Sequence, residues 1–367
     1  MHAPLASALR IEWRPLSCLH TVADEWRSLA ARALEPNVFY EPAFALAAEP
    51  AFGADVHAAL VWLGPKLVGF FPAKIERHRY GVTLPVLVGW THPYALLGTP
   101  LIAGEFAQEV LIAWLEHLAG RPDLPALALL PLVPQKGLFA TAFNAVMAGR
   151  RHAAFGAHQR ALLAPIEART GYLQRTVNGR TRKERRRQRR RLEEKGAVTF
   201  ASAAGAVALD EFLNLEASGW KGRAGTAAQK HDELHEFMRK AIAGLGGNAT
   251  VHRLLLNGKA VAAAITLRSR DQGWFWKTAY DESVAQFSPG VLLALELTEC
   301  LLADDSLARV DSCAIANHPM IDRLWGERLA LVDRLILARP SKTFGLVCRL
   351  EALRRAGIAS AKRLLSR

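Results

Sequence analysis

One continuous stretch, residues 273–293 (GWFWKTAYDESVAQFSPGVLL), has the residue types and spacing of an anion-binding turn. Its first part has the period of two that is typical of a strand, with one alternating set made of Trp274, Trp276, Thr278 and Tyr280. Ser288 then stands where a helix N-cap belongs, Pro289 suits the first helical position, and an apolar helix follows from Val291. Gly290 allows a ligand to approach the backbone. The amides and positive dipole end of such a helix favour a phosphate, although an ordinary strand-to-helix connection has the same pattern.

Four side chains in and after this stretch have the chemistry to move protons: Tyr280, Asp281, Asp311 and His318. Asp311 lies in the apolar run ARVDSCAI, which predicts a semi-buried carboxylate whose pKa is raised by desolvation. The Tyr280 hydroxyl and the His318 imidazole are groups that donate or relay protons. Each residue also has a structural alternative: a carboxylate bonded to nearby backbone, a packed strand tyrosine, or a histidine in a helix cap.

Two further groups have the character of ligand-binding residues. The loop GWKGRAGT (219–226) contains Trp220, which offers an apolar face, and Lys221 and Arg223, which offer cationic donors for a carboxylate or phosphate. In the first half, we expect a similar aromatic cluster to face the cleft between the two halves; it consists of Trp90, His92 and Tyr94.

The net charge of +13 is concentrated in two segments. Residues 180–195 hold eight Arg and two Lys against three Glu, and residues 339–367 hold eight basic residues against one Glu, so each segment has a net charge of +7. The first reads as a solvated helix, or as a surface for RNA, an anionic membrane or a nucleotide-linked substrate. Within the second segment, residues 341–367 are predicted to form a basic amphipathic helix that either contacts a membrane or packs on the protein.

Composition sets the broad class. With 367 residues and 51% hydrophobic content, the chain is long and apolar enough for a globular protein of about two domains. We expect no transmembrane segment and no signal peptide, because no apolar run approaches roughly 18 residues and the start lacks a charged-then-apolar pattern. The four scattered cysteines lack metal-binding spacing and suggest reduced thiols in a cytoplasm.

Hydrophobic periodicity predicts the same order of elements twice. In the first half, the ranges expected are 9–13, 21–33, 36–49, three strands within 55–90, 106–118, 126–133 and 137–150. In the second half, the ranges expected are 197–203, 208–221, 231–245, 273–282, 289–303, 308–315, 318–328 and 329–339. Two further strands before residue 273 are joined by a hairpin turn at Asn257-Gly258. Both halves give a strand, two helices, three antiparallel strands, a helix, a strand and a helix. The sequence therefore predicts an α+β protein with two copies of one fold, each a mixed, mostly antiparallel sheet flanked by helices.

This order, with an anion turn between the fourth strand and the next helix, resembles the GNAT acyltransferase superfamily. The chain is most similar to bacterial proteins with tandem GNAT folds, the FemAB-like aminoacyltransferases and the cellulose-biosynthesis-associated acetyltransferase group. The resemblance covers about residues 10 to 340 and is sharpest over YD…FSPG…LL (280–293) and HPMIDRLWGER. It departs from the usual glycine-rich turn, because Gln286 to Val291 supplies only Gly290.

The resemblance implies a degenerate N-terminal domain at 1–165, a C-terminal acyltransferase domain at 166–340 and a basic C-terminal helix at 341–367. It implies acetyl-CoA or another acyl-CoA as co-substrate, with no metal, in the second domain. Carried over by position, pantetheine would lie along Lys277, Thr278, Ala279 and Tyr280, and the phosphates would meet the amides of Phe287, Ser288, Gly290 and Val291 around Pro289. The 219–226 loop would clasp the acceptor.

The function implied is transfer of an acyl group from CoA to a primary amine, with Asp311 or Asp281 assisting deprotonation. The acceptor would be an anionic small molecule or an envelope or polysaccharide precursor. Two alternatives stay open: an aminoacyl-tRNA-dependent transferase of the FemAB-like kind, and a non-catalytic basic protein that binds RNA or membrane. The first would give the arginine helix a direct task.

Overall fold

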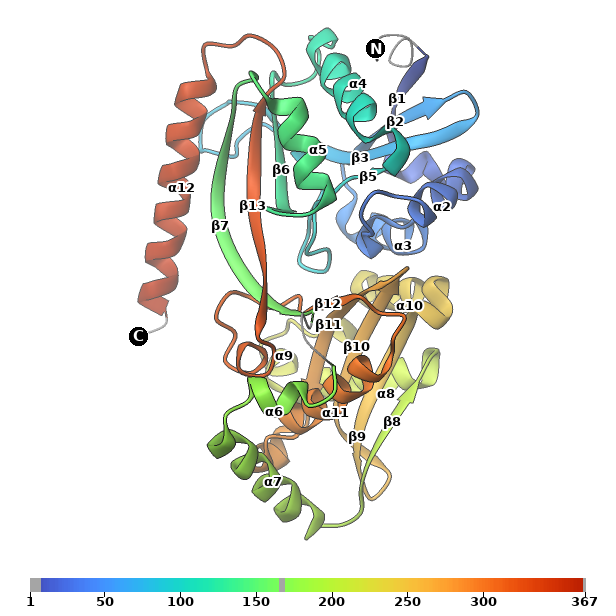
Figure 1. Ribbon diagram of the computed structural model, residues 1–367, viewed down its shortest axis with the longest axis vertical. Helices are drawn as coiled ribbons and strands as arrows, with labels where there is room; N and C mark the ends of the chain where they lie inside the picture. Colours follow the sequence, from blue (N-terminus) through green and yellow to red (C-terminus); the bar gives the residue numbers. More distant parts are fainter. Residues whose placement is uncertain (1–7, 165–168, 366–367) are drawn as a thin grey trace. The chain divides into compact units, whose positions relative to one another are not determined.

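The computed structural model describes residues 8–164 and 169–365, and Figure 1 shows their elements in chain order. The chain divides into two compact units. The first comprises Met1–Pro42, Phe52–His158 and Ala330–Arg367, and the second comprises Ala43–Ala51 and Gln159–Leu329.

The two units exchange segments, whereas the predicted division was sequential. Helix α3 (Pro42–Phe52) groups with the second unit, where the Phe44 ring lies 5.3 Å from Phe237 and 5.5 Å from Trp276 between centroids. Strands β7 (His152–Leu163) and β13 (Glu327–Leu337) each run from one unit into the other. The last strand and the helix after it therefore belong mainly to the first unit.

The first unit is a mixed sheet with strand order β1-β2-β3-β4-β6-β13. The pairs are antiparallel except β4 with β6, which are parallel at Leu87↔Ala128 and Val88↔Leu129. Helices pack against this sheet, as the upper part of Figure 1 shows. The bounds are β1 Leu9–Pro15, β2 His57–Leu63, β3 Lys66–Glu76, β4 Val86–Gly89, β5 Leu101–Ile102, β6 Leu127–Pro134, α2 Ala23–Ala31, α4 Ala107–Gly120 and α5 Leu138–Met147.

The second unit repeats this plan with strand order β12-β11-β10-β9-β8. The hairpin between β9 and β10 turns at Asn257 and Gly258, and both residues have positive φ, as the sequence predicts. The core is built around α11 and the strands beneath it. The bounds are β8 Val198–Ala203, β9 Ala249–Leu256, β10 Lys259–Ser269, β11 Gln272–Tyr280, β12 Arg309–Asp311, α6 Tyr172–Thr176, α7 Gly179–Glu193, α8 Ala206–Ser218, α9 Trp220–Arg223, α10 Asp232–Leu245 and α11 Pro289–Ala303. The α+β class is confirmed, and the order of a strand, two helices, three strands, a helix and a strand occurs in both halves of the chain.

Three predictions of local structure are wrong. The segment 318–328 is not a helix, because only Ile321–Arg323 forms a 3-10 turn before β13 begins. Tertiary hydrogen bonds hold its end, since the Gly326 N–H donates to the Tyr172 hydroxyl at 2.8 Å. The strand expected over 308–315 ends at Asp311. Strand β7 was not predicted, because its alanine-rich sequence has weak strand propensity.

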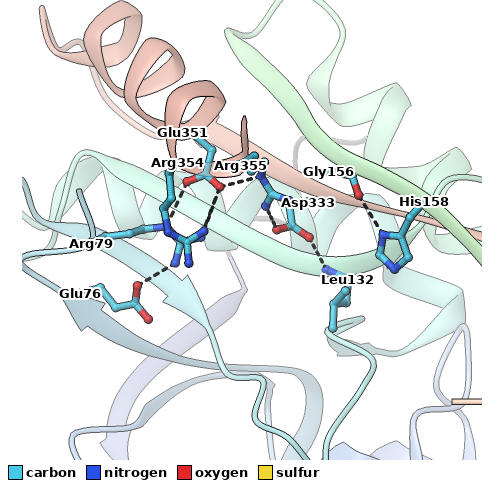
Figure 2. Close-up of polar contacts among 9 residues, drawn as sticks. All are labelled: Glu76, Arg79, Leu132, Gly156, His158, Asp333, Glu351, Arg354 and Arg355. Carbon is cyan, nitrogen blue, oxygen red and sulfur yellow. Dashed lines mark hydrogen bonds and ion pairs between the residues drawn. The ribbon is translucent and has the colours of Figure 1, made fainter. Parts of the chain in front are cut away.

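The C-terminal helix α12 (Phe344–Leu365) is held to the first unit by a buried ion cluster, shown in Figure 2. Glu351 has no exposed surface and accepts hydrogen bonds from Arg79 Nε at 3.2 Å and Arg355 Nε at 2.7 Å. Arg355 also pairs with Asp333, which accepts the Leu132 N–H at 2.8 Å. Apolar residues of the same helix pack beside this cluster. The basic helix expected at 341–367 thus packs on the first unit through one face of its first part, whereas Leu346, Leu353 and Ile358 are exposed.

We expect Glu351→Gln to lower the free energy of unfolding by roughly 3–5 kcal/mol, because it removes one partner of a buried charge cluster. Glu76→Gln is the matched control, since Glu76 pairs with the same Arg79 at 2.8 Å but its side chain is 26% exposed. That change is expected to cost at most about 1 kcal/mol. Urea unfolding measures both. Equal losses in the two variants would contradict the central role of Glu351.

The same carboxylate predicts an acid dependence of stability. Burial alone would raise the pKa of Glu351, but the Arg79 and Arg355 charges outweigh burial and hold it below its ordinary value of 4.5. A carboxylate with a depressed folded pKa stabilises the protein above its unfolded pKa, and this contribution disappears as pH falls through the folded pKa. Unfolding titrations below pH 4.5 are therefore expected to show a smaller loss of stability for Glu351→Gln than for the unchanged protein.

Candidate active site

A cleft of about 560 Å³ lies in the second unit beside the end of β11. β11 pairs with β12 over three residue pairs, the last being Trp274↔Asp311, but it follows β10 as far as Tyr280. The two parallel neighbours therefore separate beyond Trp274. The cleft is lined by the end of α8, by β11, by the start of α11 and by residues 318–320: Leu215, Glu216, Gly219, Trp276, Lys277, Thr278, Ala279, Tyr280, Glu282, Ala285, Ser288, Pro289, Gly290, Val291, His318, Pro319 and Met320.

Most residues predicted to hold the donor lie together in this cleft. Lys277, Thr278 and Ala279 come from β11, whereas the segment from Ser288 to Val291 comes from the start of α11. Strand and helix start are joined by a short 3-10 segment, Glu282–Phe287, so the sequence order itself brings them together.

Strand β11 has a bulge at Trp276. Its neighbour Lys277 faces Ile265 on β10, but Phe275 faces the adjacent Thr266, so one residue of β11 is extra. An extra residue bends a strand locally and re-aims its backbone, and bulges are common beside active sites. The bulge occurs just after β11 leaves β12. The backbone along the cleft is therefore shaped differently from a regular ladder.

The start of α11 offers fewer amides than the sequence predicts. Ser288 occupies the N-cap position, but its backbone is left-handed (φ 51°, ψ 54°) and its side chain makes no capping bond. Its own N–H donates to Ala285 O at 2.8 Å, and the Val291 N–H donates to Ser288 O at 2.9 Å. Pro289 has no N–H. Among the described residues, this leaves the Gly290 N–H of this first turn without an acceptor.

Gly290 is not required by packing. A methyl group on its Cα would lie 3.5 Å from the Tyr280 ring, which is ordinary van der Waals contact. Tyr280 lines the cleft and is 38% exposed. Phe287, by contrast, is a core residue, and the guanidinium of Arg191 on α7 lies 5.6 Å from its ring centroid. A cation from the arginine-rich helix therefore lies beside the segment that leads into α11.

His318 lines the cleft and is half-buried. Its Nδ1 lies 3.3 Å from the Met320 amide nitrogen and 3.5 Å from that of Ile321, and both amides donate to it. Because Nδ1 accepts, the neutral ring carries its proton on Nε2. Burial lowers the pKa of His318, although Asp322 opposes this effect. The imidazole is therefore suited to donate a hydrogen bond rather than to accept a proton.

Asp311 does not line the cleft. It is fully buried, not semi-buried as predicted, and it forms an ion pair with Arg160, itself 3% exposed. Its second oxygen accepts the Cys313 N–H at 3.0 Å. Both oxygens are thus used inside the protein, and burial raises the pKa of the Cys313 thiol well above its ordinary value. These contacts are those of a carboxylate that fixes the end of β12.

Asp281 is likewise outside the cleft lining. Its Oδ1 accepts the Ser283 N–H at 2.9 Å and so caps the 3-10 segment that follows β11. The adjacent Glu282 does line the cleft, and it pairs with Arg223 at 2.6 Å. Of the predicted acceptor-binding loop, Arg223 thus lies at the rim. The side chains of Trp220 and Lys221 lie outside the described part of the structure.

Glu216 is a cleft residue that the sequence did not reveal. It is 3% exposed, and its Oε2 accepts the Ala228 N–H at 3.0 Å. The periodicity of α8 could have indicated its burial, because Glu216 lies on the apolar face of this helix, in phase with Leu209, Phe212 and Leu213. A carboxylate on that face is buried when the helix packs on the sheet. In the second unit, it is the buried carboxylate of the cleft lining.

The predicted aromatic cluster of the first unit packs around Phe52. Trp90 is 1% exposed, and its Nε1 donates to Phe52 O at 2.9 Å. His92 stacks on the Phe52 ring at 4.2 Å, and Tyr94 lies 5.5 Å from the same ring. Trp90 therefore has almost no surface that an acceptor could contact.

The first unit also has two neighbouring parallel strands that separate, but a loop of the same unit fills the space between them. β4 and β6 are the equivalent parallel pair, and the segment after β4 crosses beyond their last pairing. There the Gly98 N–H donates to Leu132 O at 3.3 Å, and a Cβ on Gly98 would lie 2.0 Å from Pro131 O. The loop backbone at Gly98 thus occupies the position beside β6 that corresponds to the open edge of β11.

Comparison with known proteins agrees with this geometry. Residues 179–318, from the start of α7 to His318, match the family model described as "Acetyltransferase (GNAT) domain". The fold and the cleft define a tandem α+β architecture with one open strand junction. Within the second unit, the segment from α7 to His318 is therefore similar to the GNAT acetyltransferase domain family. A search of curated proteins found no match.

Solved structures share the fold over both units. A conserved protein of unknown function from Bacteroides thetaiotaomicron is 12% identical with a TM-score of 0.55, covering 89% of this chain and 100% of the other. The C-terminal domain of a putative lysylphosphatidylglycerol synthetase from Agrobacterium fabrum is 11% identical with a TM-score of 0.55, covering 91% and 96%. FemX is 9% identical with a TM-score of 0.55, covering 86% and 96%. At these identities the likeness concerns the fold alone.

Neither membrane spans nor metal clusters occur in the described ranges. No helix there is both long and apolar enough to cross a bilayer. Groups of three or more metal-ligating His, Cys, Asp or Glu side chains are also absent from residues 8–164 and 169–365.

Proposed function

We propose that the second unit transfers an acyl group from an acyl-CoA to a primary amine. One observation carries this proposal: the cleft beside β11 joins an open strand edge, a bulge and the first turn of α11 within one unit. An extended pantetheine arm would lie along residues 277–280. Its pyrophosphate would meet the Gly290 N–H and the positive end of the helix.

Two cationic side chains near the start of α11 would add to the phosphate binding that its single available amide provides. Lys277 lines the cleft, and Arg191 lies beside Phe287 just before α11. Two cations and one amide N–H would together bind the phosphates. Arg191 gives the arginine-rich helix a specific task in donor binding.

The chemical step assigns roles to three cleft residues: Glu216, His318 and Tyr280. The amine nitrogen attacks the thioester carbonyl carbon, and Glu216 accepts the proton that the nitrogen loses. The carbonyl oxygen becomes negative and accepts a hydrogen bond from the Nε2–H of His318. As the carbon–sulfur bond breaks, the thiolate takes a proton from the Tyr280 hydroxyl. Tyr280 recovers a proton from solvent, to which Glu216 releases its own.

The acceptor would enter at the rim formed by Arg223 and Glu282. Because Glu282 already pairs with Arg223, the rim presents both charges to an incoming amine or anion. We retain an amine-bearing envelope or polysaccharide precursor as the acceptor class that the family suggests. Four free cysteines support a reducing, cytoplasmic setting.

Aminoacyl-tRNA is a second candidate donor. The observation that favours it is the exposed face of α7, which carries Arg180, Lys183, Arg187 and Arg190 at the solvent. Such a row of cations binds nucleic-acid phosphates. The alternative that the protein only binds RNA or membrane predicts neither thiol release nor aminoacyl transfer.

Release of free thiol from acetyl-CoA, with a panel of primary amines, tests the proposal. We expect thiol release that depends on the amine, and an increase in Tm with CoA that tRNA does not give. An increase in Tm with tRNA but not with CoA would instead favour the aminoacyl-tRNA donor. If neither thiol release nor aminoacyl transfer is detected, both enzymatic hypotheses are rejected.

A further inference from the structure

A second groove, of about 490 Å³, lies between α7 and α11. Its floor is apolar and comes from Leu173, Val177, Leu292 and Leu295. The remaining lining residues are polar: Gln174, Arg182, Arg185, Arg186, Arg189, Glu296 and Glu299. Four arginines against two glutamates give this lining a net charge of +2. The donor cleft does not share these residues.

Two of the four arginines are already engaged in structure. Arg182 donates to the Val177 carbonyl at 3.0 Å and closes the end of α6. Arg189 pairs with Glu193 at 3.0 Å and also with Glu296. These contacts neutralise one glutamate of the groove and fix α7 on α11.

The other two arginines retain unused donors. Arg185 donates to Gln188 at 2.6 Å, but its Nε is buried and has no partner among the described residues. Arg186 is exposed and has no ion pair in the part of the chain that the structure describes. Both arginines line the groove together with its apolar residues, and guanidinium groups bind anionic headgroups.

The lining distinguishes between classes of anion. RNA would place successive phosphates near Glu299 and would find no aromatic side chain on which to stack a base. Free phosphate would leave the leucine floor in water. A lipid satisfies both features, because its hydrocarbon chain covers apolar surface while its phosphate meets the arginines.

We propose that this groove binds a phosphate-headed lipid, with the phosphate on Arg185 and Arg186 and the chain along Leu292 and Leu295. The site is independent of the acyl-transfer chemistry. Lipid binding would therefore persist even if no amine acceptor were ever acylated.

The test uses the full chain and short-chain dihexanoyl phosphatidylglycerol below its micelle concentration, with binding measured by calorimetry. Dihexanoyl phosphatidylcholine, inorganic phosphate and a single-stranded RNA are the comparison ligands. We expect phosphatidylglycerol to bind at least about tenfold more tightly than any of these, since only it combines a net negative head with a chain.

Helix α7 supplies a charge-matched control. The groove variant is Arg185→Glu with Arg186→Glu, and the control is Lys183→Glu with Arg190→Glu, two exposed residues outside the lining. Each pair changes the net charge by the same amount. We expect the groove variant to weaken phosphatidylglycerol binding at least about tenfold and the control less than about twofold. Leu295→Asp should also weaken binding, and melting curves check that all variants fold.

Three outcomes would overturn the proposal. Equal weakening by both charge-reversed pairs would indicate general attraction to a basic helix rather than a site. Equal binding of phosphatidylcholine would remove the role of the arginines. Binding of RNA or inorganic phosphate as tight as that of phosphatidylglycerol would assign the groove to another anion.

Discussion

Gly290→Glu is expected to abolish binding of the acyl donor. The new carboxylate would project toward Tyr280, at the first turn of α11, where the proposal places the pyrophosphate. Like charges about 4 Å apart near a protein surface repel by several kcal/mol. CoA affinity should therefore fall at least about a hundredfold, measured by calorimetry. The fold should be retained, because this position has space for a side chain.

Gly290→Ala is the matched control for this experiment. Its methyl group would make ordinary contact with Tyr280 at 3.5 Å and add no charge. CoA affinity should change by less than about tenfold, since only close approach to the backbone is affected. If Gly290→Glu binds CoA as well as the unchanged protein, the start of α11 does not bind the donor phosphates.

Glu216→Gln is expected to remove acyl transfer while leaving the donor bound. Glutamine keeps an oxygen that can accept the Ala228 N–H, so the local structure persists, but it cannot accept a proton from the amine. Loss of a general base typically costs 10²- to 10⁴-fold, and we expect kcat to fall by roughly that factor. The KM for the acyl donor and the affinity for CoA should stay within about threefold.

Glu211→Gln tests whether any acid of the same helix gives this effect. Glu211 lies on α8 but pairs with Arg253 at 2.6 Å and does not line the cleft. Its replacement should leave kcat near that of the unchanged protein. Equal kcat values for Glu216→Gln and Glu211→Gln would exclude Glu216 as the base.

Local patterns in the sequence were sufficient for much of the fold. The Asn257-Gly258 turn, the strand before Tyr280 and the helix from Pro289 are all present as predicted. Each of these depends on backbone preferences or on periodicity within a few residues. The same local order also placed Lys277 and Gly290 together at the cleft, because a short connection joins strand to helix.

Side-chain environments were less predictable. Asp311 is neutralised by Arg160, a residue 151 positions away in the chain, and no local pattern encodes that pairing. The number of free amides at α11 was also overestimated, because the left-handed backbone of Ser288 redirects the first turn. Both errors concern contacts or conformations that neighbouring elements impose.

The sequence by itself therefore determined the class of fold, its duplication and the short connection that brings the end of β11 to the start of α11. Only the tertiary structure decided which buried carboxylate faces the cleft: Glu216 instead of Asp311. It also decided that the first unit's strand junction is closed by the chain around Gly98. The physical reason is that propensity and periodicity act over a few residues, whereas burial and ion pairing depend on residues that folding brings together from distant positions.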